Sequence, residues 1–147
     1  MTSVRRYPDP WTRGFHPVYA AEKAALPFGE EFYDLSGAVE YGVDLLSSDW
    51  WKAKYPHIKW IWICESNNQK FAWAWNREVH LPQFAMNESY FLHEITHIGT
   101  GDEDGELHHG PYFRKNFCEL LDERMGEWVG NNLRYWYERY GVPVADV

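Results

Sequence analysis

The spacing of apolar residues changes twice along this chain, and these changes limit its fold more than any other feature. Strong helix formers occupy 18–26, and apolar residues recur at helical spacing over 36–48, where Asp34 or Ser36 supplies an N-cap. Over 58–81 apolar residues instead occupy every second position, which is typical of strands. Helical spacing then returns and continues almost to the end of the sequence. Helices and strands in separate blocks predict an α+β fold.

Three short strands are expected in the middle of the chain, at 58–64, 71–75 and 78–81. Turn-forming residues separate each strand from the next. The pattern therefore predicts a small antiparallel sheet of about three strands, arranged as a meander. The first strand carries one fully apolar face, which includes Trp60 and Trp62.

Three helices are expected after the strands. Asn87 is a good N-cap for the first of them, and the glycines at 99 and 101 are expected to end it. Pro111 begins the second helix, which runs to about Met125. The third covers the remaining residues to about 140.

A chain of 147 residues (17.5 kDa) is large enough to bury about two thirds of its unfolded surface in a single domain, 1–147. Residues 1–17 contain three prolines and are expected to form an irregular arm. Aromatic residues make up 18% of the chain, more than a core of this size needs. We favour an aromatic-rich core over a surface groove lined by rings. Cys64 and Cys118 are expected to be buried free thiols.

The charge of the chain excludes one class of partner. A net charge of -8 and a pI near 5.3 argue against non-specific binding to nucleic acid, because an acidic surface repels phosphates. The first residues lack the apolar stretch of a signal peptide, and no apolar run reaches the roughly 18 residues of a membrane span. We therefore expect a cytoplasmic protein without nucleic-acid or membrane partners.

The first of the helices expected after the strands carries the motif His93-Glu94-Ile95-Thr96-His97. Residues four apart lie on one helix face, so His93 and His97 can aim both imidazoles at one ion. Glu94 lies about 100° round the helix, too far to be the natural third ligand but close enough to hold a metal-bound water. The motif predicts a Zn²⁺ site in which Glu94 is the general base. The alternative is a half-buried helix whose histidines only make hydrogen bonds.

A catalytic zinc site needs a third protein ligand and one open position. His109 is our prediction for that ligand, because three glycines lie between it and His97 and the rigid Gly110-Pro111 pair follows it. His108 is the alternative, followed by an acid from the intervening loop such as Glu103. The metzincin pattern HExxHxxGxxH does not apply, because its glycine is Thr100 here.

The predicted mechanism is hydrolysis by metal-activated water. Zinc lowers the pKa of its bound water, and Glu94 transfers a proton from that water to the leaving amine. Tyr112 or Tyr90 is a candidate donor to the oxyanion or the substrate. The strand at 79–81 is expected to pair with an extended peptide. His57 and His80 are expected to be structural or surface residues, and His16 receives no role.

The sequence resembles a family of small HExxH metallohydrolases from actinobacteria and their phages, which are distantly similar to SprT-like zinc metallopeptidases. The segments that carry the resemblance are Val18–Glu22, Ser48–Trp51, Tyr55-Pro56, Leu81-Pro82, Leu92–His97 and His109–Phe113. The resemblance implies a zincin-like minidomain, in which a small sheet packs against helices that carry the site. It also implies a metallopeptidase-like activity, whereas a peptide or protein substrate is expected from the residues around the motif and from the strand before it. In SprT-like enzymes the third ligand is the histidine of an HG pair, which corresponds to His109.

Two further functions stay open at this point. One is zinc-dependent hydrolysis of a non-peptide amide, and the other is a catalytically inert, zinc-stabilised phage or structural module. Glu94 favours an enzyme, because a purely structural site has no use for a carboxylate beside its metal and more often closes with a fourth protein ligand.

Overall fold

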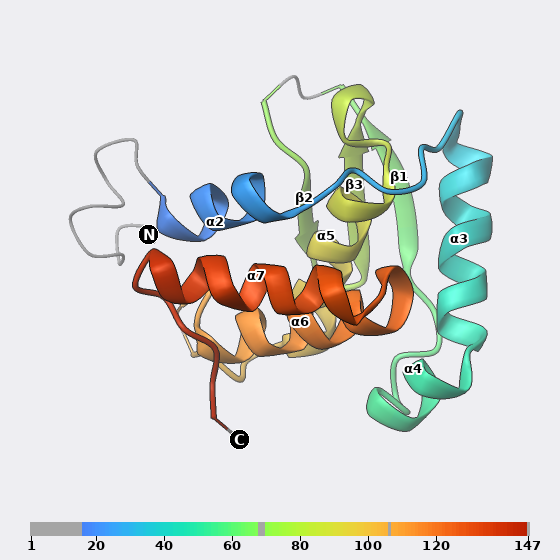
Figure 1. The fold of residues 1–147 in the computed structure, drawn as a ribbon. Helices are drawn as coiled ribbons and strands as arrows, with labels where there is room; N and C mark the ends of the chain where they lie inside the picture. Colours follow the sequence, from blue (N-terminus) through green and yellow to red (C-terminus); the bar gives the residue numbers. More distant parts are fainter. Residues whose placement is uncertain (1–15, 68–69, 106, 147) are drawn as a thin grey trace. The chain divides into compact units, whose positions relative to one another are not determined.

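A computed structural model describes residues 16–67, 70–105 and 107–146 (Figure 1). The described residues form six α-helices and a three-stranded sheet, so the α+β class is confirmed. In chain order the elements are α2 (Pro17–Ala25), α3 (Leu35–Ser47), α4 (Asp49–Lys54), β1 (Trp62–Ser66), β2 (Trp73–Trp75), β3 (Glu78–Pro82), the 3-10 helix η2 (Gln83–Ala85), α5 (Glu88–Thr100), α6 (Pro111–Met125) and α7 (Glu127–Arg139). The predicted arm lies outside the described residues up to residue 15, and Pro17 already belongs to α2. The chain divides into two compact units, Pro27–Gly99 and Met1–Leu26 with Thr100–Val147.

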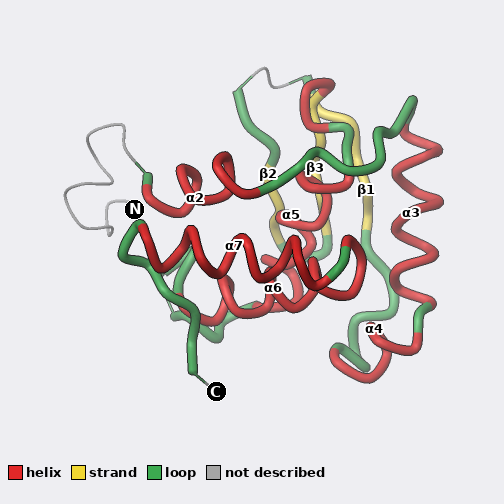
Figure 2. The backbone as a smooth tube through the Cα atoms, viewed as in Figure 1, coloured by secondary structure: helices red, strands yellow, loops and turns green. Residues whose placement is uncertain are grey.

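The sheet, in the unit Pro27–Gly99, has the strand order β1-β3-β2 (Figure 2). β2 and β3 are antiparallel and joined by a tight turn, in which Asn76 adopts a positive φ of 64°. β1, however, is parallel to β3 over five residue pairs. The predicted antiparallel meander is therefore wrong, and the sheet is mixed. The physical reason is that β3 pairs with both other strands and so takes the centre, which alternation along the sequence does not indicate.

The first strand begins later than the sequence pattern predicts. Residues 58–61 lie outside the sheet. The Arg77 guanidinium donates to the carbonyl oxygen of Trp60 at 3.1 Å and to that of His57, just before this segment, at 3.4 Å. The predicted apolar face enters the core only in part, because Ile58 is buried whereas the side chains of Trp60 and Trp62 are 54% and 63% exposed. These rings lie on the surface.

The helices of this unit begin at the polar residues that the sequence indicates. Asp34 caps α3 by accepting from the Gly37 N–H at 3.1 Å, and Ser48 caps α4 by accepting from the Trp51 N–H at 3.2 Å. α3 then packs against α5 through an aromatic cluster, in which the rings of Tyr41 and Phe91 lie 5.5 Å apart. This packing holds α5 against the rest of the unit.

The second unit contains α2, α6 and α7. Gly126, with φ 107°, is the one residue between α6 and α7, and these helices pack against each other while α7 also packs against α2. Gly130 brings α7 close to α6, because a Cβ there would lie 1.8 Å from the Asp122 Oδ1. Arg134 on α7 holds the same carboxylate with two hydrogen bonds, at 2.7 and 3.1 Å.

The expectation that both cysteines are buried holds for one of them. Cys118 is buried on α6, whereas Cys64 is only half-buried because its strand lies at the edge of the sheet.

Among the described residues, no helix combines the length and the apolar character that crossing a bilayer would require.

Candidate metal centre

Helix α5 carries the HExxH motif, and polar contacts fix where this helix begins. The Asn87 side chain accepts from the Tyr90 N–H at 3.1 Å, which is the predicted N-cap. Glu88, in the first turn, accepts from the Glu30 N–H at 3.0 Å and also from the Tyr41 hydroxyl. A carboxylate at this end of a helix is favourable because it faces the positive end of the helix dipole. These contacts set the position of the turns that follow.

The next turns of α5 bring the motif residues together. The ring centroids of His93 and His97 lie 5.3 Å apart, and the Glu94 Oε2 lies 4.0 Å from the His93 Nε2. His93 and Glu94 are each only 6% exposed, and His97 is half-buried. Burying imidazoles and a carboxylate costs free energy unless they are bound by other groups. A metal ion bound by the imidazoles would offset part of that cost.

The opposite side of α5 is a rigid apolar support. Phe91, Leu92 and Ile95 are fully buried. The sequence predicted that Gly99 would help to end the helix. Instead Gly99 lies inside the helix, where a Cβ would come 2.7 Å from the Tyr55 ring. The close approach of Tyr55 explains this glycine, and the helix ends one residue later, before Gly101 with φ 56°.

His109 lies just before α6 and is held by its own surroundings. Its carbonyl oxygen accepts from the Arg114 Nη1 at 2.5 Å, and the same guanidinium donates to the Pro143 carbonyl at 2.7 and 2.9 Å. Three aromatic rings meet the imidazole edge-on, those of Phe113 at 4.9 Å, Tyr19 at 5.1 Å and His16 at 5.5 Å. The ring is therefore fixed in both position and orientation.

Asp104, in the acidic loop, fixes the start of α6. Its two carboxylate oxygens accept from the N–H groups of Tyr112 at 2.9 Å and Phe113 at 2.7 Å. Gly110 allows this approach, because a Cβ there would lie 2.6 Å from the Asp104 Cγ. The segment that follows His109 is thus held by Asp104, a contact that the sequence did not indicate.

The nitrogen atoms that His93, His97 and His109 offer as ligands all lie within 4.8 Å of one another, close enough to hold one metal ion. These are the three residues that the sequence predicts as ligands. The alternatives, His108 and Glu103, are both exposed, and the Glu103 Oε1 accepts from the Asn116 amide at 2.8 Å. Three imidazole donors suit zinc and leave one coordination position for a water or substrate.

The other residues considered for the site have different positions. Tyr112 is half-buried at the start of α6 and Tyr90 is 36% exposed, and their role as donors stays a prediction. The expectation that 79–81 pairs with a peptide is wrong for most of this strand, because β3 is central and pairs on both sides. The structural role expected for His80 is confirmed, since it stacks on Trp73 at 3.6 Å.

Sequence reasoning missed the residues that hold the third imidazole. His16 and Tyr19 contact the His109 ring but precede it by about ninety residues. No local spacing connects residues so distant. Tyr19 falls in a segment that carries the resemblance, but nothing in the sequence indicated that it contacts His109.

The comparisons found no family model, no curated protein and no solved structure that matches this chain. The resemblance to SprT-like metallopeptidases therefore rests on the motifs alone.

Proposed function

We propose that this chain is a zinc-dependent peptidase, in which His93, His97 and His109 hold the ion and Glu94 is the general base. The observation that carries the proposal is the grouping of three imidazoles within 4.8 Å, with a buried carboxylate 4.0 Å from one of them. A purely structural site would more often close with a fourth protein ligand. The buried carboxylate favours catalysis.

The donor set supports zinc. Three neutral imidazoles with an open fourth position form one of the known ligand sets of catalytic zinc. A zinc ion in this set supplies a Lewis acid that polarises the scissile carbonyl and lowers the pKa of a bound water. Imidazole also binds copper and nickel, so the metal needs to be identified by measurement.

The chain's own residues supply the proton transfers. Glu94 accepts a proton from the water whose oxygen attacks the carbonyl carbon. When the C–N bond breaks, Glu94 donates that proton to the leaving nitrogen, which restores the carboxylate. The position of Glu94 supports this role, because its carboxylate lies 4.0 Å from the Nε2 of His93, one of the proposed ligands, and so beside the place where the attacking water would be held.

The arrangement in α5 also supports the zincin-like architecture that the resemblance implies. A helix with both histidines and the glutamate packs within a unit that contains a small sheet. The strand that precedes this helix is central, so the proposal assigns no peptide-pairing role to it. Peptide amides are proposed as substrates because HExxH on a helix is the motif of metallopeptidases.

The test compares the unmodified protein with Glu94→Gln, both loaded with zinc, on a denatured proteome whose new N-termini are sequenced. We expect cleavage by the unmodified protein and a loss of at least about a hundredfold in Glu94→Gln, because general-base catalysis contributes on that order. Glu123→Gln is the matched control, since it removes an exposed carboxylate of α6 that has no part in the proposed site and should leave cleavage unchanged.

Zinc content and circular dichroism of each variant separate a catalytic loss from loss of metal or fold. A zinc-loaded, folded protein that cuts nothing in this digest would contradict the peptidase proposal and favour an inert module.

A further inference from the structure

One face of the three-stranded sheet carries large aromatic side chains at the surface. Side chains of paired residues on neighbouring strands lie on the same face of a sheet. Trp62 of β1 pairs with Glu78 of β3, and Glu78 pairs with Trp75 of β2, so these three side chains form one row across the sheet. The opposite face carries the buried residues Val79 and Leu81. We call the face with the row of Trp62, Glu78 and Trp75 the tryptophan face.

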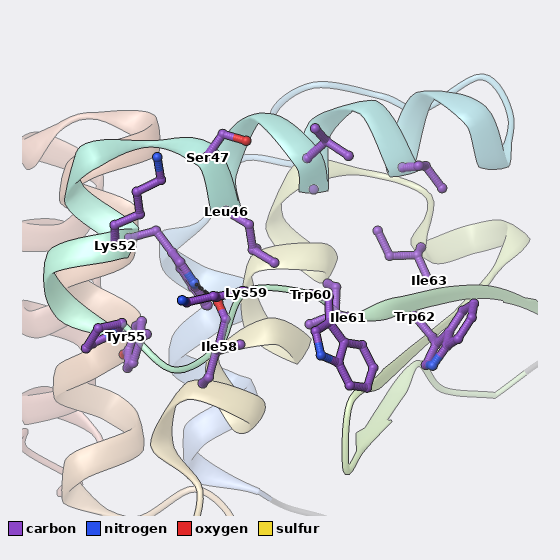
Figure 3. Close-up of a pocket in the computed structure, with 15 residues that line it drawn as sticks. Leu46, Ser47, Lys52, Tyr55, Ile58, Lys59, Trp60, Ile61, Trp62 and Ile63 are labelled. Atoms are coloured by element: carbon purple, nitrogen blue, oxygen red, sulfur yellow. Dashed lines mark hydrogen bonds between the residues drawn. The ribbon is translucent and has the colours of Figure 1, made fainter.

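The two tryptophans of this row are widely exposed. Trp62 is 63% exposed and Trp75 is 73% exposed. Figure 3 shows Trp62, together with Trp60, on the side of the segment 58–63 that faces away from α3, whereas Ile63 lies on the side of that helix. Large apolar side chains that gather on one exposed face mark a binding surface more often than scattered ones do.

The middle of the row is a carboxylate that is held in place. The Glu78 side chain is 45% exposed, and its Oε1 accepts from the His80 Nε2 at 2.9 Å. The His80 ring in turn stacks on Trp73, with the ring centroids 3.6 Å apart and the ring planes 7° apart. Within the described part of the chain, the Glu78 Oε2 has no hydrogen-bond or ion-pair partner. The face therefore presents an oriented negative charge between two exposed indoles.

The same surface already holds one guanidinium against an indole. The Arg77 guanidinium carbon lies 5.0 Å from the centre of the Trp60 ring, within the roughly 6 Å of a cation–π contact. The rings of Trp60 and Trp62 are neighbours, with centroids 6.3 Å apart. Of the residues that the structure describes, none places a cation over the rings of Trp62 and Trp75 in this way.

We propose that the tryptophan face binds an arginine side chain of a partner polypeptide. The guanidinium lies against the rings of Trp62 and Trp75 and donates to the Glu78 carboxylate. The Cα atoms of the two tryptophans are two strand spacings, or about 10 Å, apart, so a guanidinium above Glu78 lies between them. Arginine fits better than lysine, because its planar group is weakly hydrated, stacks on aromatic rings and matches the shape of a carboxylate.

Other occupants use this face less completely. A sugar ring would stack on the tryptophans but would leave the charge of Glu78 without a partner of opposite sign. Nucleic-acid bases would also stack, but their phosphates would meet a carboxylate on a chain of net charge -8. A second copy docked face to face would bring its own Glu78 toward the first one. A cation is the ligand that uses both the rings and the carboxylate.

The test titrates a blocked tripeptide, with arginine between two glycines, into the full chain and follows the indole N–H signals by NMR. Two further tripeptides replace the arginine by lysine, which keeps the charge, or by citrulline, which keeps the planar shape without the charge. We expect the arginine peptide to shift the signals of Trp62 and Trp75 in a saturable way. The affinity should be at least about threefold lower for the lysine peptide and about tenfold lower for the citrulline peptide.

Variants assign the binding to this face. Trp62→Leu and Trp75→Leu should each weaken the arginine peptide about two- to fivefold, as expected for one cation–π contact at an exposed site. Trp128→Leu, at a similarly exposed tryptophan of α7, should leave it unchanged. Glu78→Gln should also weaken it about two- to fivefold, as expected for an exposed ion pair. Glu65→Gln, at an exposed carboxylate of β1 in register with the buried Leu81, should not.

Each of these variants is expected to fold, because the tryptophans and Glu65 are exposed and a glutamine at 78 can still accept from His80. The two tryptophan variants also assign the indole signals.

Three results would overturn the proposal. The first is that the arginine peptide shifts neither indole signal. The second is equal affinity for the arginine peptide and for the lysine or citrulline peptide. The third is arginine binding that Trp62→Leu, Trp75→Leu and Glu78→Gln all leave intact.

Two further measurements examine the other occupants. Saturable binding of cellohexaose, an uncharged oligosaccharide, at the same indoles would contradict the proposal. A dimer in sedimentation that Trp62→Leu dissociates would contradict it as well. Because the tryptophan face contains none of the proposed zinc ligands, these results do not depend on metal loading or on cleavage.

Discussion

His108 and His109 are neighbours with opposite surroundings. The imidazole of His109 is 6% exposed among three aromatic rings, and His108 is exposed. We predict that His109→Ala lowers zinc affinity by about a hundredfold or more, since loss of even a residue that only orients a ligand costs about 10–100-fold. His108→Ala should change it less than about threefold. Competition with a chromophoric chelator measures both affinities.

The pair of variants is its own control, because each removes one imidazole from the same loop. Equal losses of zinc affinity in His108→Ala and His109→Ala would refute the assignment of His109 as the third ligand. Circular dichroism of both metal-free variants excludes unfolding as the cause.

The two cysteines also differ in their burial and in their expected reactivity. Burial raises the pKa of Cys118 to about 12, so only about one molecule in a thousand carries its thiolate at pH 9. Partial burial, with a smaller effect of Glu78, raises the pKa of Cys64 as well, but Cys64 is only half-buried. We predict that iodoacetamide labels Cys64 in the native protein and spares Cys118 up to pH 9, as peptide mapping would reveal. Labelling of Cys118 at the same rate would contradict its burial.

At the scale of elements, two helical glycines are expected to respond in opposite ways to alanine. A Cβ added at Gly130 would clash with the Asp122 carboxylate and the Cys118 carbonyl oxygen. Gly130→Ala should therefore lower the free energy of unfolding by about 1–3 kcal/mol through overpacking. Gly37 has only ordinary contacts, at 3.7 Å or more, so Gly37→Ala should raise it by about 0.5–1 kcal/mol. Urea denaturation measures both, and equal effects would contradict the close α6–α7 contact.

The sequence predicted the helices well because their ends depend on local chemistry. Asp34, Asn87 and Pro111 each mark a helix start in the structure as they do in the sequence. The strand arrangement was predicted less well. Alternation identifies strands but does not say which strand pairs with which, so the central place of β3 and its parallel pairing with β1 were missed.

The same limit explains why the exposure of Trp60 and Trp62 was not predicted. Trp60 and Trp62 were expected on the apolar face of a strand, and alternation alone does not say whether that face meets a core. In the structure Trp60 precedes β1 and Trp62 begins it at the edge of the sheet. The expectation that some rings lie near the surface is confirmed for these two residues.

At the scale of the whole molecule, the candidate site was predictable where its chemistry is local. His93 and His97 follow from their spacing on one helix, and His109 follows from a short, glycine-containing loop and the rigid pair after it. Tyr19 and His16, which contact the His109 ring, come from the other end of the chain. Only folding brings residues so distant in the sequence into contact with His109.

Zinc K-edge X-ray absorption on the purified, zinc-loaded chain, with the metal content measured in parallel, tests the central claim most directly. The account predicts one zinc per chain with three imidazole nitrogens at about 2.0–2.1 Å and one further light atom. It also predicts that His93→Ala and His97→Ala each lose the ion. A chain that retains no zinc, or a closed shell of four protein ligands, would contradict it.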